Sequence, residues 1–426
     1  MRPPKIVLIG AASGSFGPPM VADAVLTPEV RGARLVLVDL DADRLAVVQK
    51  VAERLSEACG ADLTIEATTD RRAALPGADF VIVSVAVRRF ELWRQEFEIP
   101  LRHGIRQVLG ENGGPGGLFH ALRNIPLLLS IGRDVEELAP QALLINFTNP
   151  LSRICLALHR ATRLRWVGLC HGIGMGVRSV ARITGLDPDL IVPRAAGINH
   201  FTWMLTLTHR QTGEDLYPLL RQRHAVYDPS FQPLSRALFE RIGLYPSPSD
   251  DHIGEYLPFA WEYCGLEGYD FAEAERRRAA RWQELVAIAE GRRPVDRREI
   301  RPSGELAFPI IAGILSNTPR YLDAVNLPND GHIANLPKGA IVEVPGVATA
   351  DGVHGLAMGE LPPAVVGWIQ AQLAVQELVV EAALTGSRQV ALQALLADPV
   401  VDSVRAAERV LDELLALERA YLPQFQ

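Results

Sequence analysis

Short, uninterrupted apolar runs alternate with amphipathic stretches through roughly the first 195 of the 426 residues, and this alternation constrains the fold most. Each run is continuously apolar, which is typical of parallel strands covered by helices on both faces. The runs that we predict to be strands are residues 6–9, 35–38, 80–85, 142–145 and 166–169, and helical patterns between them include 42–58 and 118–138.

The pattern changes near residue 196 to mixed α and β with more helix, and helical periodicity recurs at 234–244, 271–290 and 361–420. A chain of this length is longer than one hydrophobic core usually organises, so we expect two domains. We therefore predict an α/β protein: an N-terminal Rossmann-like, doubly wound parallel sheet over residues 1–195 and a C-terminal α+β, helix-rich domain over residues 196–426. The long apolar C-terminal helices favour packing between subunits, as in a homodimer or homotetramer.

Composition narrows the class of protein. The net charge is −7 and the lysines and arginines are dispersed, so we expect no nucleic-acid partner. We see no apolar stretch long enough for a bilayer and no secretory signal in MRPPKIVLIGAASG, so we expect a cytoplasmic protein without a membrane partner. The four scattered cysteines do not indicate a disulfide framework, which leaves a thiol free to bind metal.

The first predicted strand runs into a glycine-rich turn that precedes a helical stretch. Such a turn lets the backbone approach a pyrophosphate, and the helix N-terminus stabilises its charge. An acidic residue at the end of the second strand is placed to bind the ribose hydroxyls and favours NAD over NADP, because a carboxylate repels a 2′-phosphate. The alternative is an ordinary turn with a surface aspartate. The residues expected to bind NAD are Gly10, Ala12, Ser13, Gly14 and Phe16 in the turn, Asp39 after the second strand, and Asn146.

Further polar clusters lie beyond predicted strand ends, where ligands bind in such sheets. The loop 110–117 contains Glu111 and Asn112 among many glycines, which fits either a ligand contact or a plain loop with a helix cap. Asn149 precedes Pro150 and either forms a turn or hydrogen-bonds a sugar hydroxyl or the nicotinamide ribose.

Two clusters contain residue types suited to metal binding and proton transfer. Cys170 and His200 could supply a thiolate and an imidazole to one divalent cation, leaving positions open for substrate oxygens. The alternative is a buried small hydrophobe and a satisfied histidine. Asp250 and Asp251 beside His252 suit a proton-transfer group if they are buried together, and otherwise form a solvated acidic loop.

Together these segments resemble glycoside hydrolase family 4, the NAD- and manganese-dependent glycosidases. The resemblance starts at KIVLIGAASGSF and passes through GPGGLFHALRNIP, NFTNP, GLCHG and GINHFTW to NLPNDGHIANLPKGAIVEVPG at residues 326–346. Each segment is short, but their order and separations are specific. Dehydrogenases of the lactate and malate type share only the first part.

The resemblance implies roles for individual residues. Cys170 and His200 correspond to ligands of Mn²⁺ or another divalent metal. Asn149 corresponds to a substrate contact at the cofactor end, and we expect Glu111 and Asn112 also to bind substrate. The segment with Asp250 and Asp251 corresponds to the loop of the proton-abstracting base, for which we favour Asp250 and keep Asp251 as the alternate.

Two departures from family patterns carry information. His171 replaces the Asp found in the phospho-glycosidase branch, which implies unphosphorylated α-glycosides such as an α-glucoside, α-galactoside or α-glycosiduronate. His171 is also a possible acid for the leaving group. The family loop usually reads Gly-Ala-Gly-Ser, so the methyl group of Ala12 could crowd the pyrophosphate and weaken NAD binding.

The implied reaction begins with hydride transfer from C3 of the sugar to NAD⁺, which makes the C2 proton acidic. Loss of that proton expels the aglycone, water adds at C1, and the hydride returns to C3. The alternatives to a glycosidase are an NAD-dependent 2-hydroxy-acid dehydrogenase and a non-catalytic NAD-binding protein.

We also expect the basic segment 276–281 to be a solvated helix face or a subunit contact. If this segment faced the active site, it would instead favour a uronate substrate.

Overall fold

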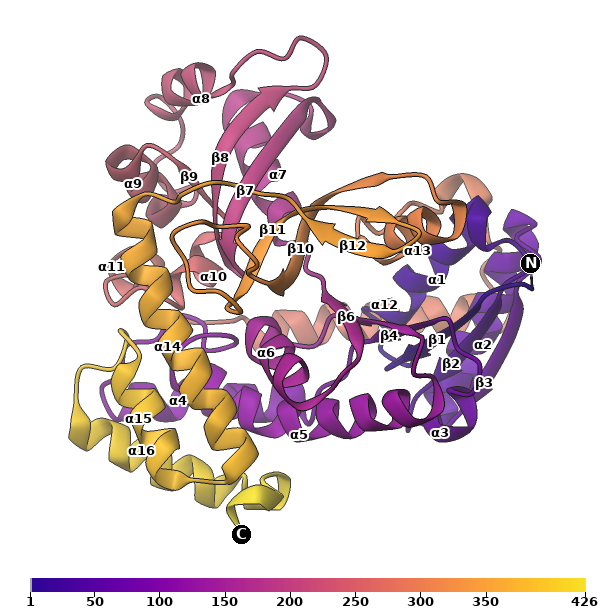
Figure 1. Ribbon diagram of the computed structural model, residues 1–426, viewed down its shortest axis with the longest axis horizontal. Helices are drawn as coiled ribbons and strands as arrows, with labels where there is room; N and C mark the ends of the chain where they lie inside the picture. The colour runs from indigo at the N-terminus through magenta and orange to yellow at the C-terminus, as the bar shows by residue number, and fades with distance from the viewer. Residues whose placement is uncertain (1) are drawn as a thin grey trace.

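One twelve-stranded sheet runs through the computed structural model, which describes residues 2–426 (Figure 1). The strand order is β3-β2-β1-β4-β5-β6-β10-β11-β7-β8-β9, with β12 paired to β11. The first six strands are parallel in the order of a doubly wound dinucleotide-binding sheet, so the predicted Rossmann-like architecture is confirmed. They are β1 (Lys5–Ile9), β2 (Arg34–Val38), β3 (Thr64–Thr68), β4 (Phe80–Val83), β5 (Leu143–Asn146) and β6 (Arg165–Gly168).

Helices cover both faces of this parallel half. Side chains of β1 alternate between two hydrophobic cores: Val7 and Ile9 pack into one, and Ile6 and Leu8 pack into the other. This double burial explains why the strands are continuously apolar in sequence. The helices are α1 (Gly17–Leu26), α2 (Ala42–Cys59), α3 (Arg71–Ala74), α4 (Arg89–Arg102), α5 (Gly114–Leu138), α6 (Leu151–Ala161) and α7 (Gly172–Thr184).

The C-terminal half extends the same sheet with antiparallel strands. Asn326 of β10 pairs with Gly168 of β6, and Glu343 of β11 pairs with Gly197 of β7. These pairings bring the end of β6 close to the turn between β7 and β8, although the two segments are separated by α7. The strands are β7 (Ile191–Ile198), β8 (Phe201–His209), β9 (Tyr245–Ser247), β10 (Arg320–Pro328), β11 (Ile341–Thr349) and β12 (Gly352–Gly355).

The helices of the C-terminal half surround this extension. The predicted helical region 361–420 is divided into three, with breaks at Gly386, where φ is +68°, and at Asp398. These three form one end of the molecule, next to the C-terminus (Figure 1). The helices are α8 (Tyr217–His224), α9 (Pro233–Ile242), α10 (Asp250–Gly254), α11 (Trp261–Cys264), α12 (Phe271–Ala289), α13 (Ala307–Ser316), α14 (Pro363–Thr385), α15 (Arg388–Ala397) and α16 (Val404–Leu417).

Helix α14 is long and apolar enough to cross a membrane by length and composition. It packs against α5, α6 and α15, and Val375, Val379 and Val380 are buried in the core that these helices share. The apolar character of α14 is therefore explained by its place as a core helix of the fold.

Candidate active site at the strand ends

The glycine-rich turn after β1 has the close backbone packing that a pyrophosphate cradle needs. Gly10 has φ +91°, and a Cβ atom there would lie 2.0 Å from the carbonyl oxygen of Ser84. A Cβ atom on Gly17 would lie 1.9 Å from the carbonyl oxygen of Ala11. Helix α1 begins at Gly17, and Phe16 before it makes no side-chain cap within the described residues 2–426. The first turn of α1 offers no free amide, because Pro18 and Pro19 have no N–H group and the N–H of Gly17 donates to the carbonyl oxygen of Ser13 at 3.1 Å; the glycine-rich turn itself is therefore the part suited to a pyrophosphate.

Asp39 lies beside this turn, as a ribose-binding carboxylate should. Its Oδ2 accepts a hydrogen bond from the backbone N–H of Ala12 at 2.9 Å. Ala12 is 3 % exposed, and its methyl group packs in the hydrophobic core beneath the turn. The methyl group therefore takes up core volume and does not line the open side of the loop. Phe16 packs against Phe147, with ring centroids 4.9 Å apart.

The side-chain amide of Asn146 forms both of its hydrogen bonds with Thr148, within the same turn. Its Oδ1 accepts the N–H of Thr148 at 3.1 Å, and its Nδ2 donates to the carbonyl oxygen of Thr148 at 3.2 Å. Asn146 is fully buried, so it shapes the segment that carries Asn149. The Nδ2 of Asn149 donates to Oε1 of Glu111 at 3.3 Å, which joins two of the expected substrate-binding residues.

Cys170 and His200 meet at the junction between the two halves of the sheet. The Sγ atom of Cys170, just after β6, lies 3.4 Å from Nε2 of His200, in the turn between β7 and β8. His200 has φ +63°, a rare conformation for a side-chain-bearing residue that marks functional turns. Bonds of about 2.0–2.3 Å from nitrogen and sulfur to one cation are compatible with this separation. The two residues therefore fit as ligands of a single divalent metal.

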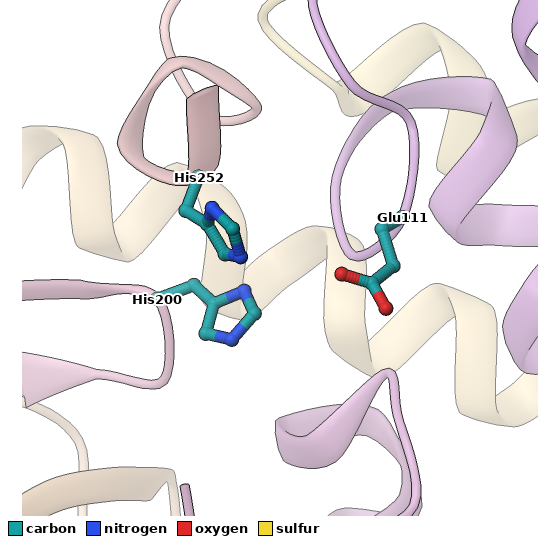
Figure 2. Close-up of side chains that lie close together, drawn as sticks. All are labelled: Glu111, His200 and His252. Atoms are coloured by element: carbon teal, nitrogen blue, oxygen red, sulfur yellow. The ribbon is translucent and has the colours of Figure 1, made fainter. Parts of the chain in front are cut away.

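The other nitrogen of His200 faces a second group of polar side chains. Its Nδ1 lies 3.0 Å from Nδ2 of Asn112, and its ring centroid lies 4.5 Å from that of His252. Glu111, His200 and His252 each place a potential ligand atom within 4.8 Å of the others, and Figure 2 shows them converging. Sequence reasoning did not assign a role to His252; its only signal was its position beside Asp250 and Asp251.

The electrostatics of this group are set by burial and by ion pairs. Burial opposes the charge of Glu111, but its ion pair with Arg89 and the nearby histidines lower its pKa to about 2. Burial lowers the pKa of His200 to about 3, so its imidazole is neutral and can bind metal. Burial raises the pKa of the Cys170 thiol, and ionisation to a ligand therefore needs a bound cation.

The two adjacent aspartates point to different places. Asp250 accepts hydrogen bonds from the N–H groups of Leu234 and Ser235, both at 2.7 Å, and from the Ser235 hydroxyl at 2.6 Å. Its carboxylate therefore caps α9. Asp251 accepts from Nδ1 of His252 at 2.9 Å. Burial disfavours the charged form of His252, but the bond and charge of Asp251 raise its pKa to about 9.

Two glutamates that sequence reasoning did not single out support the site. The Oε2 atom of Glu255, after α10, accepts the backbone N–H groups of Glu111 at 2.7 Å and Gly113 at 2.9 Å, and also that of Asn112. This buried carboxylate thus fixes the loop that carries Glu111 and Asn112. On the other side, Oε1 of Glu305 lies 3.0 Å from Nδ1 of His171, next to Cys170.

Known proteins match nearly the whole length of the chain. The model "Family 4 glycosyl hydrolase" matches residues 5–186, and "Family 4 glycosyl hydrolase C-terminal domain" matches residues 195–401. An α-glucosidase of Erwinia rhapontici is 34% identical, with 98% of each chain covered. The solved structure of a putative glucosidase, lplD, from Bacillus subtilis is 28% identical with a TM-score of 0.88, covering 97% of this chain and 99% of that one.

Two more distant structures bear on the cofactors and on the dehydrogenase alternative. A 6-phospho-α-glucosidase from gut microorganisms, solved in complex with NAD and Mn²⁺, has a TM-score of 0.87 at 22% identity with full coverage of both chains. Malate dehydrogenase of Plasmodium falciparum has a TM-score of 0.54 at 13% identity, covering 89% of this chain and 98% of that one. The likeness to the dehydrogenase is limited to the fold.

Proposed function

Because the chain belongs to glycosyl hydrolase family 4, it is an enzyme that cleaves O-glycosidic bonds, and we propose that its substrates are unphosphorylated α-glycosides. The observation that carries the metal-dependent glycosidase reaction is the 3.4 Å approach of Cys170 Sγ to His200 Nε2 beside a dinucleotide-binding sheet, and the choice of unphosphorylated sugars rests on His171 after Cys170. A simple 2-hydroxy-acid dehydrogenase has no use for such a pair, and a non-catalytic NAD-binding protein has no use for the polar group around it.

The cofactors are NAD⁺ and a divalent cation such as Mn²⁺. When bound, NAD⁺ supplies a hydride acceptor and the cation supplies a Lewis acid for the sugar oxygens. The turn from Gly10 to Phe16 and the carboxylate of Asp39 would hold NAD⁺. Cys170 and His200 would hold the cation. The side-chain amide of Asn112 lies against Nδ1 of His200, and with the amide turned so that its unpartnered Oδ1 accepts the Nδ1–H it would orient the ring, as groups behind metal ligands commonly do.

We propose that Asp251 and His252 move the proton at C2 of the sugar. The side chain of His252 lies in the group that contains His200 and Glu111, and Asp251 accepts a hydrogen bond from its Nδ1, whereas the carboxylate of Asp250 is occupied at the start of α9. Asn149 and Glu111 would bind sugar hydroxyls. His171, held through Nδ1 by Glu305, would protonate the leaving oxygen from its other ring nitrogen.

We also propose a cytoplasmic location and an assembly of identical subunits. All four cysteines are free thiols, which suits a reducing cytoplasm and a thiolate ligand. We propose a homodimer or homotetramer, supported by leucines that remain exposed on the C-terminal helices. Leu384 of α14, Leu396 of α15 and Leu417 of α16 are 45%, 43% and 46% exposed.

The function is tested with 4-nitrophenyl α-glycosides deuterated at C2, assayed with NAD⁺ and Mn²⁺. We expect a slower reaction of the deuterated substrate or exchange of the C2 position with solvent, and no net accumulation of NADH. Cleavage with neither an isotope effect nor exchange, or stoichiometric NADH release, would contradict the proposed reaction.

A further inference from the structure

A buried glutamate on β11 lies between the segments that carry Cys170 and His200. Glu343 is 2% exposed, and its Oε2 atom accepts hydrogen bonds from Nδ2 of Asn199 at 2.8 Å and from Nδ2 of Asn326 at 2.7 Å. Asn199 directly precedes His200 in the turn between β7 and β8. Glu343, Asn199 and Asn326 are neither metal ligands nor cofactor contacts nor proton-transfer groups in the proposed reaction.

The pairing of the strands brings the same carboxylate close to Cys170. Glu343 pairs with Asn326 between β11 and β10, and Asn326 pairs with Gly168 of β6. Gly168 lies two residues before Cys170. Burial raises the pKa of the Cys170 thiol, and the charge of Glu343 raises it further. The carboxylate is therefore near enough for its charge to act on the sulfur.

Among residues 2–426, only neutral groups bind the carboxylate of Glu343. Its two donors are side-chain amides, and no lysine, arginine or histidine in this part of the chain forms an ion pair with it. Burial raises the pKa of Glu343, against the two amide bonds and the charge of His171, which is itself paired with Glu305. A buried carboxylate without a cation is costly, and a divalent cation bound nearby offsets that cost.

The charge of Glu343 matches the charge that the two proposed ligands leave. A divalent cation held by the thiolate of Cys170 and the neutral imidazole of His200 retains one positive charge. Glu111, whose carboxylate lies near His200, is already paired with Arg89. Glu343 supplies one negative charge in buried surroundings, where attraction between charges is stronger than in water.

We infer that Glu343 is a positioning residue of the metal site and that its charge strengthens binding of the divalent cation. This inference rests on the proposed function, because it takes Cys170 and His200 as the ligands. Through Asn199 the carboxylate fixes the turn in which His200 has φ +63°. Groups behind metal ligands commonly act in this way, by holding a ligand in place and by tuning the charge around the metal.

Glu343→Gln removes the charge and keeps the shape of the side chain. Both amide bonds end on Oε2, so the single oxygen of a glutamine can accept both and hold the turn and the strands in place. The metal-free full chain is titrated with Mn²⁺, and the electron paramagnetic resonance signal reports the free ion. We expect the dissociation constant for Mn²⁺ to rise by about 10–100-fold. An unchanged Mn²⁺ affinity in the folded variant would overturn the inference.

Glu418→Gln is the matched control, because it makes the same change at a fully buried glutamate that pairs with Arg123. It should bind Mn²⁺ as the wild type does. Both variants should bind ADP-ribose with wild-type affinity, since this ligand reports the nucleotide turn and lacks the nicotinamide charge. An equal loss of Mn²⁺ affinity in both variants would show a general effect of removing a buried carboxylate, against a specific role of Glu343.

Glu343→Asp provides a second test, which retains the charge and shortens the side chain by one methylene group. We expect this variant to bind Mn²⁺ more tightly than Glu343→Gln and closer to the wild type. The reverse order, or a loss of about 10-fold or more relative to the wild type in Glu343→Asp, would show that the charge of Glu343 is not what strengthens binding.

These measurements use Mn²⁺ alone and need no turnover, so they are independent of whether the proposed reaction occurs. A wild type that binds no Mn²⁺ would contradict the ligand pair of Cys170 and His200, and with it both proposals. A wild type that binds Mn²⁺ no more tightly than Glu343→Gln overturns the role of Glu343 and leaves the proposed reaction standing.

Discussion

The Sγ atom of Cys170 and Nε2 of His200 lie 3.4 Å apart, although the two residues are separated by thirty positions and by the whole of α7. Their approach depends on β10 and β11, which join the parallel half of the sheet to the β7–β8 hairpin. The metal site is therefore built across the junction of the two halves.

Replacement of Cys170 by serine removes the thiolate ligand while it preserves side-chain size. We expect Cys170→Ser to lower Mn²⁺-dependent kcat/KM by about 100-fold or more, because loss of even a supporting residue behind a ligand costs about 10–100-fold. Excess EDTA should abolish the wild-type activity, and added Mn²⁺ should restore it. Circular dichroism checks that the variant is folded, and unchanged kinetics in a folded variant would exclude Cys170 from the metal site.

Substitution of Asp251 should change the rate of catalysis, whereas substitution of Asp250 should change the stability of the fold. Asp251→Asn should lower kcat by about 10²–10⁴-fold, the usual contribution of a proton-transfer group, with little change in unfolding free energy. Asp250→Asn should reduce the free energy of unfolding by about 1–2 kcal/mol, because its carboxylate caps α9. Steady-state kinetics and urea unfolding measure both. A large kcat effect from Asp250→Asn, with Asp251→Asn near wild type, would reverse our assignment.

Glu255 should stabilise the loop 111–113 through its three backbone hydrogen bonds. Glu255→Ala leaves buried N–H groups unpaired, so we expect a loss of about 3 kcal/mol or more in unfolding free energy. Glu255→Gln retains one acceptor oxygen and should have a smaller effect. Urea denaturation of both variants measures this order, and equal stability of Glu255→Ala and wild type would contradict the role of Glu255.

The pair of His252 and Asp251 predicts a pH dependence of stability in the metal-free enzyme. The pKa of His252 is raised from 6.5 to about 9, so its contribution is complete below pH 6.5 and is lost as the pH rises to 9. At about 1.4 kcal/mol per pKa unit, the ceiling of this contribution is about 3 kcal/mol. In urea denaturation with EDTA, the stability difference between wild type and His252→Asn should shrink across this range. A constant difference would show that His252 is not held charged by Asp251.

The carboxylate of Asp39 should select the cofactor. Asp39→Ser removes the charge that opposes a 2′-phosphate and also the acceptor for the Ala12 N–H group. We expect NAD⁺ to bind more weakly and the ratio of NADP⁺ to NAD⁺ affinity to rise, as measured by equilibrium titration of tryptophan fluorescence. An unchanged ratio would place the adenosine ribose elsewhere.

The strands of the parallel half were predictable because burial on both faces leaves a continuous apolar run. Strand β3 was missed because it lies at the sheet edge, half-exposed, and its sequence TIEAT has only one large apolar side chain. The approach of Cys170 to His200 was predictable from family resemblance. The directions of Asp250 and Asp251 were not, because neighbouring residues at the start of a short helix point to different sides and the sequence does not show which side faces the site.

The support from Glu255 and Glu305 could not be predicted either. Each contacts a segment more than 130 positions away, so only the folded chain brings the partners together. Ala12 shows the reverse case: a substitution that looked harmful in sequence places its methyl group in the core.

The central claim is that Cys170 and His200 share one cation, and Co²⁺ loading of the metal-free enzyme tests it most directly. A cobalt–thiolate bond produces a sulfur-to-metal charge-transfer band in the near ultraviolet. We predict that this band appears in the wild type at one equivalent of Co²⁺ and is absent in Cys170→Ser, and that His200→Ala weakens Co²⁺ binding. A wild-type spectrum without the band, or the same band in Cys170→Ser, would contradict the account.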